Sequence, residues 1–161
     1  MLFSDPRSAI RDPSLNMLVS AKAEYACLAM LELAARHGDP KPVRLADIAE
    51  KHGIPQRFLV QILLQLKGSG LVASTRGAAG GYLLARAPED ISLADVLGVV
   101  DRTDPAANGS NRPTTRRGEV SSLTSALRGV WDSLLRARHE ILERTTLASL
   151  VEAGYGLQYV I

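Results

Sequence analysis

The chain has 161 residues, of which 46% are hydrophobic and 22% charged, with a formal net charge of +2 at pH 7. This composition excludes a disordered chain, a single cysteine excludes an internal disulfide, and no apolar run approaches the ~20 residues that span a bilayer. The N-terminus also lacks the basic-then-apolar pattern of a signal peptide, so we expect a cytoplasmic protein without membrane contact. Aromatic residues make up only 4% of the chain, which predicts a mainly helical core of Leu, Ala, Val and Ile.

The first predicted element is a central helix. Residues 1–16 precede it, have scattered charges and no apolar period, and are expected to form a flexible extension. The helix is predicted over 20–36, with Ser20 as its N-cap. Apolar residues cover most of its circumference, which indicates a position in the middle of the fold.

Two further helices follow in quick succession. The first is predicted over 44–52 and ends at Gly53, and the second over 55–67 begins with a first-turn proline. Apolar residues of the second helix share one face, which we expect to point inward: Leu59, Ile62, Leu63 and Leu66. The opposite face carries Arg57, Val60, Gln61 and Leu64.

A glycine-rich hairpin comes next. Strands are predicted over 71–75 and 82–85. The tip between them and the first residue of the second strand read RGAAGGY. The tip glycines, Gly77, Gly80 and Gly81, would let the backbone enter a narrow groove and offer N–H groups to phosphates. Arg76 is suited to an A·T-rich minor groove, and Tyr82 is expected to pack at the base of the hairpin. A turn that needs positive φ is the alternative reading, although such a turn rarely needs three glycines and an arginine.

The C-terminal part is predicted to be helical again. Ser92 caps a helix that runs to about residue 102, with Asp95 as a capping-box partner. Residues 102–119 have no apolar period and are expected to form a loop. A long helix over 120–143 has apolar residues spaced alternately by three and four, which predicts a seam that packs against a like helix. The seam residues are Val120, Leu123, Leu127, Val130, Leu134, Ala137 and Ile141. Thr146 is expected to cap a short last helix that ends near Gly154.

Helix, short turn, helix and glycine-tipped hairpin in this order predict a winged helix-turn-helix domain over 17–101. The fold class is therefore mainly α with a small β-hairpin wing, and residues 120–161 supply a dimerisation helix and a C-terminal helix. In such a domain the second helix of the pair enters the major groove, where Arg suits guanine and Gln suits adenine. Gln56, Arg57 and Gln61 have these side chains, and Lys67 is placed for a phosphate. The alternative is that these are ordinary solvent-exposed residues of an amphipathic helix, which would show the same sequence pattern. The neighbouring hairpin favours DNA binding over this alternative.

Three runs of sequence carry a resemblance: MLVSAKAEYACLAMLELA, LADIAEKHGIPQRFLVQILLQLKGSGLV and STRGAAGGYLLARAPEDISLADVLGVVD. Together they resemble the IscR-like regulators, also called the Rrf-two family, over residues 17–101. The resemblance implies a homodimeric repressor or activator of transcription, whose subunits each read half of a palindrome in double-stranded DNA. Of the two, we expect a repressor. It places the recognition helix at 55–67, the wing at 76–82, and Ser20, Lys22 and Tyr25 near the DNA backbone. The long helices would cross to form the dimer, as the seam indicates independently.

Two departures from the family pattern matter. Val60 stands where some iron–sulfur members have a base-contacting Glu; it cannot accept a hydrogen bond from cytosine but can touch a thymine methyl. Cluster-binding members also have three cysteines in the loop before the long helix, whereas residues 103–122 contain none. Because cluster ligation needs thiolates, we predict no iron–sulfur cluster and no other cofactor.

The remaining Cys, His and Glu residues that could suggest a chemical site are predicted to be structural or solvent-exposed. Cys27 is interpreted as a small buried hydrophobe, and His37, His52 and His139 lack ligand spacing, so no metal site is predicted. Glu140 and Glu143 are expected on a solvated helix face. No nucleophile, base and metal occur together, which argues against an enzyme.

Two alternatives to a plain DNA-binding regulator stay open. The loop over 103–118, or the dimerisation arm, would dock a metabolic enzyme in a protein-interaction module. A small-molecule sensor would instead hold its effector between the dimerisation arm and the DNA-binding domain, and the sequence does not place such a pocket.

Overall fold

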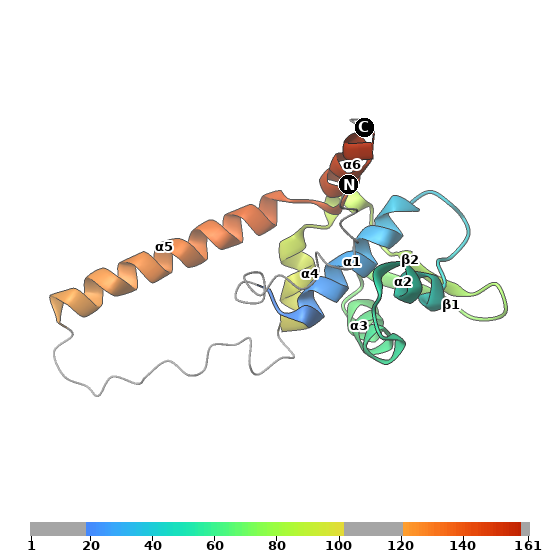
Figure 1. The fold of residues 1–161 in the computed structure, drawn as a ribbon, viewed down its shortest axis with the longest axis horizontal. Helices are drawn as coiled ribbons and strands as arrows, with labels where there is room; N and C mark the ends of the chain where they lie inside the picture. Colours follow the sequence, from blue (N-terminus) through green and yellow to red (C-terminus); the bar gives the residue numbers. More distant parts are fainter. Residues whose placement is uncertain (1–18, 102–120, 159–161) are drawn as a thin grey trace, which may run out of the picture.

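The structure, a computed structural model, describes residues 19–101 and 121–158 (Figure 1). Seven elements build the larger part: α1 (Ala21–Ala35), α2 (Leu45–His52), α3 (Gln56–Gly68), β1 (Val72–Thr75), β2 (Gly81–Leu84), the 3₁₀ turn η3 (Pro88–Asp90) and α4 (Leu93–Val100). Two helices follow the undescribed segment 102–120, α5 (Ser122–Arg144) and α6 (Leu147–Gln158). The predicted fold class is confirmed: a mainly helical chain with one two-stranded antiparallel hairpin. The predicted extension over 1–16 and the loop over 102–119 lie outside the described residues.

Helix α1 is the centre of the fold, as its all-round apolar pattern predicted. It contacts α2, α3, α4, α6 and β2, and Figure 1 shows it surrounded by these elements. Ala23, Ala26 and Ala29 are fully buried, and their small side chains let neighbouring helices approach closely. The predicted cap is present, since the Ala23 N–H donates to the Ser20 hydroxyl at 3.1 Å.

The turn between α2 and α3 depends on a glycine at the end of α2. Gly53 ends α2 with φ +62, in the left-handed region that favours glycine, and Ile54 then turns inward and is buried. Helix α3 buries the four apolar residues predicted for its inward face. Pro55, expected in the first turn, stands one position earlier as the N-cap of α3.

A buried carboxylate joins the end of α1 to α2. Glu32 is 5% exposed; it accepts one hydrogen bond from Arg36 and pairs with Lys51 at 2.7 Å and His52 at 3.2 Å. Burial alone would raise the pKa of Glu32, but the hydrogen bonds and charges of Lys51 and His52 outweigh it and hold the pKa below its usual value. This cluster could not be predicted from the sequence, because its members lie on two helices and share no motif.

The junction between the domain and the C-terminal helices is fixed by backbone pairing. Ser92 and Asp95 form both halves of the predicted capping box at the start of α4. The Leu93 N–H donates to the Thr145 carbonyl, and the Leu147 N–H to the Ile91 carbonyl. Leu147 is fully buried, so α6 is anchored on the domain. The Thr146 hydroxyl caps α6 through the Ser149 N–H, and α6 continues to Gln158 rather than ending near Gly154.

Helix α5 projects from the domain as a long arm (Figure 1). Its C-terminal end packs on the core through Leu142, but none of its residues is buried. The predicted seam residues Leu123, Leu127, Val130, Leu134, Ala137 and Ile141 are all exposed in the single chain, and Val120 lies outside the described residues. Trp131 and Leu135, which the three-four spacing left out, are half exposed beside the seam and widen the apolar stripe.

Candidate nucleic-acid interface

Helix α3 presents a polar outer face beside its buried one. Gln56, Arg57, Gln61 and Lys67, the residues predicted to meet bases or phosphate, are all exposed. The Arg57 guanidinium lies 4.8 Å from the centre of the Phe58 ring, a cation–π contact that restricts where the guanidinium points. The outer face also carries two exposed apolar side chains, Phe58 at 48% and Leu64 at 52%. Phe58 was predicted on neither face of the helix.

The hairpin is a short wing attached directly to the helix pair. Val72 pairs with Leu84 and Thr75 with Gly81 in the antiparallel register, so residues 76–80 form the tip. Arg76 stands exposed where β1 ends. Tyr82 exchanges two backbone hydrogen bonds with Val43 and packs against the core, at the base of the wing as expected.

The wing glycines have a structural reason that is independent of DNA. Gly77 has φ +104, which an L side chain rarely adopts. A Cβ on Gly80 would collide with the Thr75 carbonyl oxygen, and one on Gly81 with the carbonyl oxygen of Val43. The turn therefore requires glycine at all three positions, and their predicted approach to DNA stays a prediction.

Two side chains tie the wing to the helices. Lys67, at the end of α3, donates to the Ser74 hydroxyl of β1 at 2.6 Å. Arg44, the residue before α2, reaches the Ala78 carbonyl at the tip, at 3.5 Å. Helix α3 and the wing are thus held as one unit, and Lys67 has a structural role beside its predicted phosphate contact.

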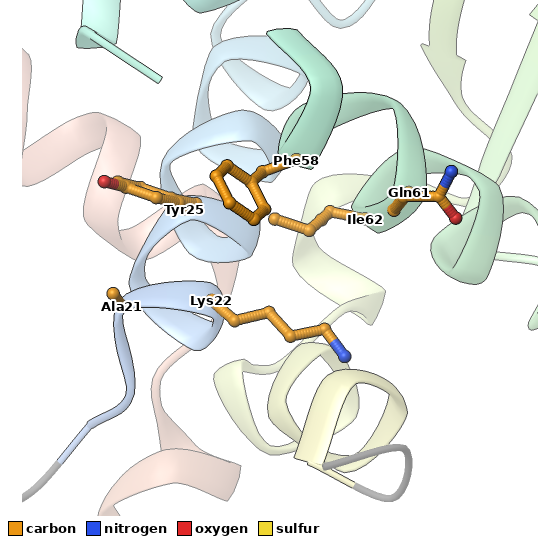
Figure 2. Close-up of a pocket in the computed structure, with 6 residues that line it drawn as sticks. All are labelled: Ala21, Lys22, Tyr25, Phe58, Gln61 and Ile62. Atoms are coloured by element: carbon orange, nitrogen blue, oxygen red, sulfur yellow. The ribbon is translucent and has the colours of Figure 1, made fainter. Parts of the chain in front are cut away.

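The start of α1 lies next to α3. The Lys22 ammonium donates to the Val100 carbonyl at the end of α4, at 3.2 Å, and Tyr25 is partly buried against the core. Lys22 and Tyr25 line a cavity together with Phe58 and Gln61 of α3 (Figure 2). The structure therefore brings three predicted contact residues, Lys22, Tyr25 and Gln61, to one place, and uses Ser20 as a helix cap.

Charge is distributed unevenly along the chain. Between Glu50 and Glu89 the sequence contains no acidic residue, although the whole chain has 17. The same stretch holds five basic residues: Lys51, Arg57, Lys67, Arg76 and Arg86. It spans α3 and the wing, so the surface built from these elements has no carboxylate of its own to repel phosphates.

Cys27, His52 and His139 have structural surroundings of their own. Burial, followed by the charges of Asp101 and Glu24, raises the pKa of Cys27 to about 11, which makes a thiolate scarce at neutral pH. His52 is engaged with Glu32 and His139 with Glu143. Within residues 19–101 and 121–158, no three His, Cys, Asp or Glu side chains are grouped to hold a metal ion. No helix in these ranges is both long and apolar enough to cross a membrane.

Known proteins share this arrangement. The profile of the Rrf2 family, described as iron-dependent transcriptional regulators, matches residues 19–153. The chain belongs to the Rrf2 family. An HTH-type transcriptional regulator of Mycobacterium tuberculosis is 43% identical over 136 residues, which cover 83% of this chain and 81% of the relative. Two solved structures also match: CymR, the global cysteine regulator of B. subtilis (32% identity, TM-score 0.69, 84% of this chain and 96% of CymR), and T. potens IscR (33%, 0.68, 88% and 90%).

Membership of the Rrf2 family decides the broad function. The match covers the helix pair, the wing and α5, so this chain is a DNA-binding transcriptional regulator with the winged helix fold of CymR and IscR. Its matched relatives are regulators rather than enzymes. The domain boundary at residue 101, a cytoplasmic location and the individual contact residues stay predictions.

An iron–sulfur cluster does not fit the residues that this Rrf2 member offers. Such clusters are held mainly by cysteine thiolates, and the chain has one cysteine. Cys27 lies on the central helix α1, and its raised pKa keeps it in the thiol form. The resemblance stated from the sequence, to a member without the cluster-binding cysteines, therefore holds.

Proposed function

We propose that this chain is a homodimeric repressor that binds a palindromic DNA operator sequence-specifically and without an iron–sulfur cluster. The observation that carries the proposal is the surface of α3 and the wing, where exposed Gln and Arg side chains stand on a stretch free of acidic residues. Phosphate neutralisation by such a surface supplies affinity, and base-edge contacts supply specificity.

Each contact residue has a proposed role. Gln56, Arg57 and Gln61 read base edges in the major groove, and Lys67 contacts a phosphate. Arg76 enters the flanking minor groove, which Gly77, Gly80 and Gly81 let the wing approach, while Tyr82 holds the base of the wing. Ser20, Lys22 and Tyr25 lie along the DNA backbone.

The dimer is supported by the exposed stripe of α5. From Leu123 to Ile141 the seam presents large apolar side chains to solvent in the single chain, and a contiguous apolar stripe of this kind marks an interaction surface. Packing against α5 of a second copy would cover it on both chains. The two winged domains would then read two half-sites about one helical turn apart, and the bound dimer would block transcription by covering the promoter.

The test is a selection of genomic DNA fragments by the purified protein at near-physiological salt, followed by sequencing and a mass measurement of the complex. We expect a recovered palindrome, two chains per site, a colourless protein, and lower transcription from a promoter that carries the site. A variant with Gln56, Arg57 and Gln61 all changed to Ala should enrich no motif, while Lys41→Ala, a change in the α1–α2 loop, should recover the same one. Enrichment of no sequence by the wild type, or one chain per site, would contradict the proposal.

A further inference from the structure

A cavity of about 360 Å³ lies between the start of α1 and α3 (Figure 2). Its volume falls in the range of sites that hold small ligands. Its lining, within the part of the chain that the structure describes, consists of Ala21, Lys22, Tyr25, Phe58, Gln61 and Ile62. It is not the place named by the sensor alternative, which lies between the dimerisation arm and the domain.

The walls of the cavity are chiefly carbon. The rings of Tyr25 and Phe58 and the side chain of Ile62 stand along one side, and Ala21 and the methylene chain of Lys22 stand across from them (Figure 2). Phe58 stays half exposed although its ring is large. Its exposed surface makes the cavity favourable for an apolar or aromatic body, which would remove that surface from water.

The described lining includes one cationic side chain, that of Lys22. Its ammonium lies at the end of α4, where it donates to the Val100 carbonyl. No acidic side chain is among the described lining residues, so Lys22 is the group of this lining that could pair with an anionic group on the ligand. Gln61 adds an amide at the rim, and its end points away from Tyr25.

We propose that this cavity binds a small molecule with an apolar ring or chain and one carboxylate, and that its binding weakens the binding of DNA. The second half rests on the proposed function. Lys22, Tyr25 and Gln61 are predicted DNA contacts, so a bound carboxylate would place a negative charge beside the phosphates and occupy the groups that should meet them.

The site is tested without DNA, with 3-phenylpropionate as the probe and neutral 3-phenylpropanamide as its matched control. Calorimetry and amide NMR of the full chain should show a dissociation constant of about 1 mM or tighter for the carboxylate, with shifts concentrated at Tyr25, Phe58 and Ile62. The amide should bind about tenfold more weakly. No binding of the carboxylate, or shifts away from these residues, would overturn the site.

Variants separate the two parts of the recognition. Lys22→Met should weaken the carboxylate about tenfold and leave the amide unchanged, which also shows that the variant is folded. Phe58→Ala should weaken both compounds, because the apolar wall is lost. Lys41→Met, which removes an exposed lysine outside the cavity, should change neither. Equal binding of the carboxylate by Lys22→Met and wild type would refute the charge recognition.

The effect on DNA is measured separately, by titrating the operator with and without saturating probe. Saturating carboxylate should weaken operator binding at least threefold, and the amide at the same concentration should not. An unchanged operator affinity would overturn the coupling and leave the site standing. If the chain bound no DNA under any condition, the proposed function would fail, while the probe measurements would still decide the cavity.

Discussion

At the scale of single residues, the most specific prediction concerns Arg76 and its contact with the minor groove. It stands exposed at the end of β1, on a tip whose backbone is held by Arg44. Arg76→Ala should weaken binding to A·T-flanked sites by about tenfold, a loss of about 1.4 kcal/mol, because a minor-groove guanidinium is lost. Arg76→Lys should recover only part of it, and Arg136→Ala, on the arm, should leave binding unchanged in fluorescence anisotropy. Equal binding by Arg76→Ala and wild type would contradict the wing assignment.

Glu32 carries a prediction on stability. Replacing it by Gln removes a buried charge that holds Arg36, Lys51 and His52, and should lower the free energy of unfolding by about 2 kcal/mol at pH 7. Because the pKa of Glu32 is lowered in the folded protein, its contribution is present above the ordinary carboxyl pKa and is lost as the pH falls through the folded value. The difference between Glu32→Gln and wild type should therefore shrink below about pH 4.

Urea unfolding across this pH range measures the effect, and Glu50→Gln is the matched control. Glu50 is exposed on α2, so its replacement should cost less than about 0.5 kcal/mol at every pH. A constant difference between Glu32→Gln and wild type from pH 7 to pH 3 would show that the loss is not electrostatic.

At the scale of elements, the wing depends on close backbone contact at Gly81. A methyl group there would meet the Val43 backbone, so Gly81→Ala should break the pairing of Tyr82 with Val43 and destabilise the fold by about 1–3 kcal/mol. Gly129→Ala provides the contrast, because Gly129 lies inside α5 with nothing near its Cβ position. That change should stabilise the helix by up to about 1 kcal/mol. Thermal unfolding of both variants measures these changes in stability. A Gly81→Ala protein as stable as the wild type would show that the backbone of Val43 does not exclude a side chain at position 81.

The arm carries the prediction on assembly. Leu134 lies in the middle of the exposed seam, so Leu134→Glu should convert the dimer to a monomer by placing a charge in an apolar interface. Ser125 is nine residues away, two and a half helical turns, and therefore faces the other side of α5. Ser125→Glu should keep the dimer in analytical ultracentrifugation. A wild-type monomer, or a dimeric Leu134→Glu protein, would show that the seam has another purpose.

Element types could be predicted from the sequence because local patterns encode them. The four buried residues of α3 and both halves of the capping box at Ser92 were placed correctly, since helical period and caps are properties of neighbouring residues. The Glu32 cluster and the cavity between α1 and α3 were missed. Both join residues far apart in sequence, and no spacing rule reports such contacts.

For the whole molecule, binding to DNA should depend steeply on salt. A dimer that brings Arg57, Lys67 and Arg76 of both subunits to the DNA would place about six cationic groups near phosphates and release about as many counterions. Its affinity should therefore fall by about a thousandfold between 50 and 200 mM salt. Lys67→Met should reduce the slope of log affinity against log salt by about two, one for each subunit. A salt-independent affinity would contradict phosphate contact by this surface.

The sequence by itself determined the order of elements, the inward face of α3, the wing and the family, because these depend on residue types at short and regular spacing. Tertiary structure alone decided that Lys22 and Gln61 share a cavity with Phe58, that Glu32 joins two helices, and that Gly81 is required by the Val43 backbone. The physical reason is the same in each case. The burial of a group, the atoms close to it and the charges near it depend on which residues the fold places beside it. In this protein many of those contacts are made around the central helix α1, which touches α2, α3, α4, α6 and β2.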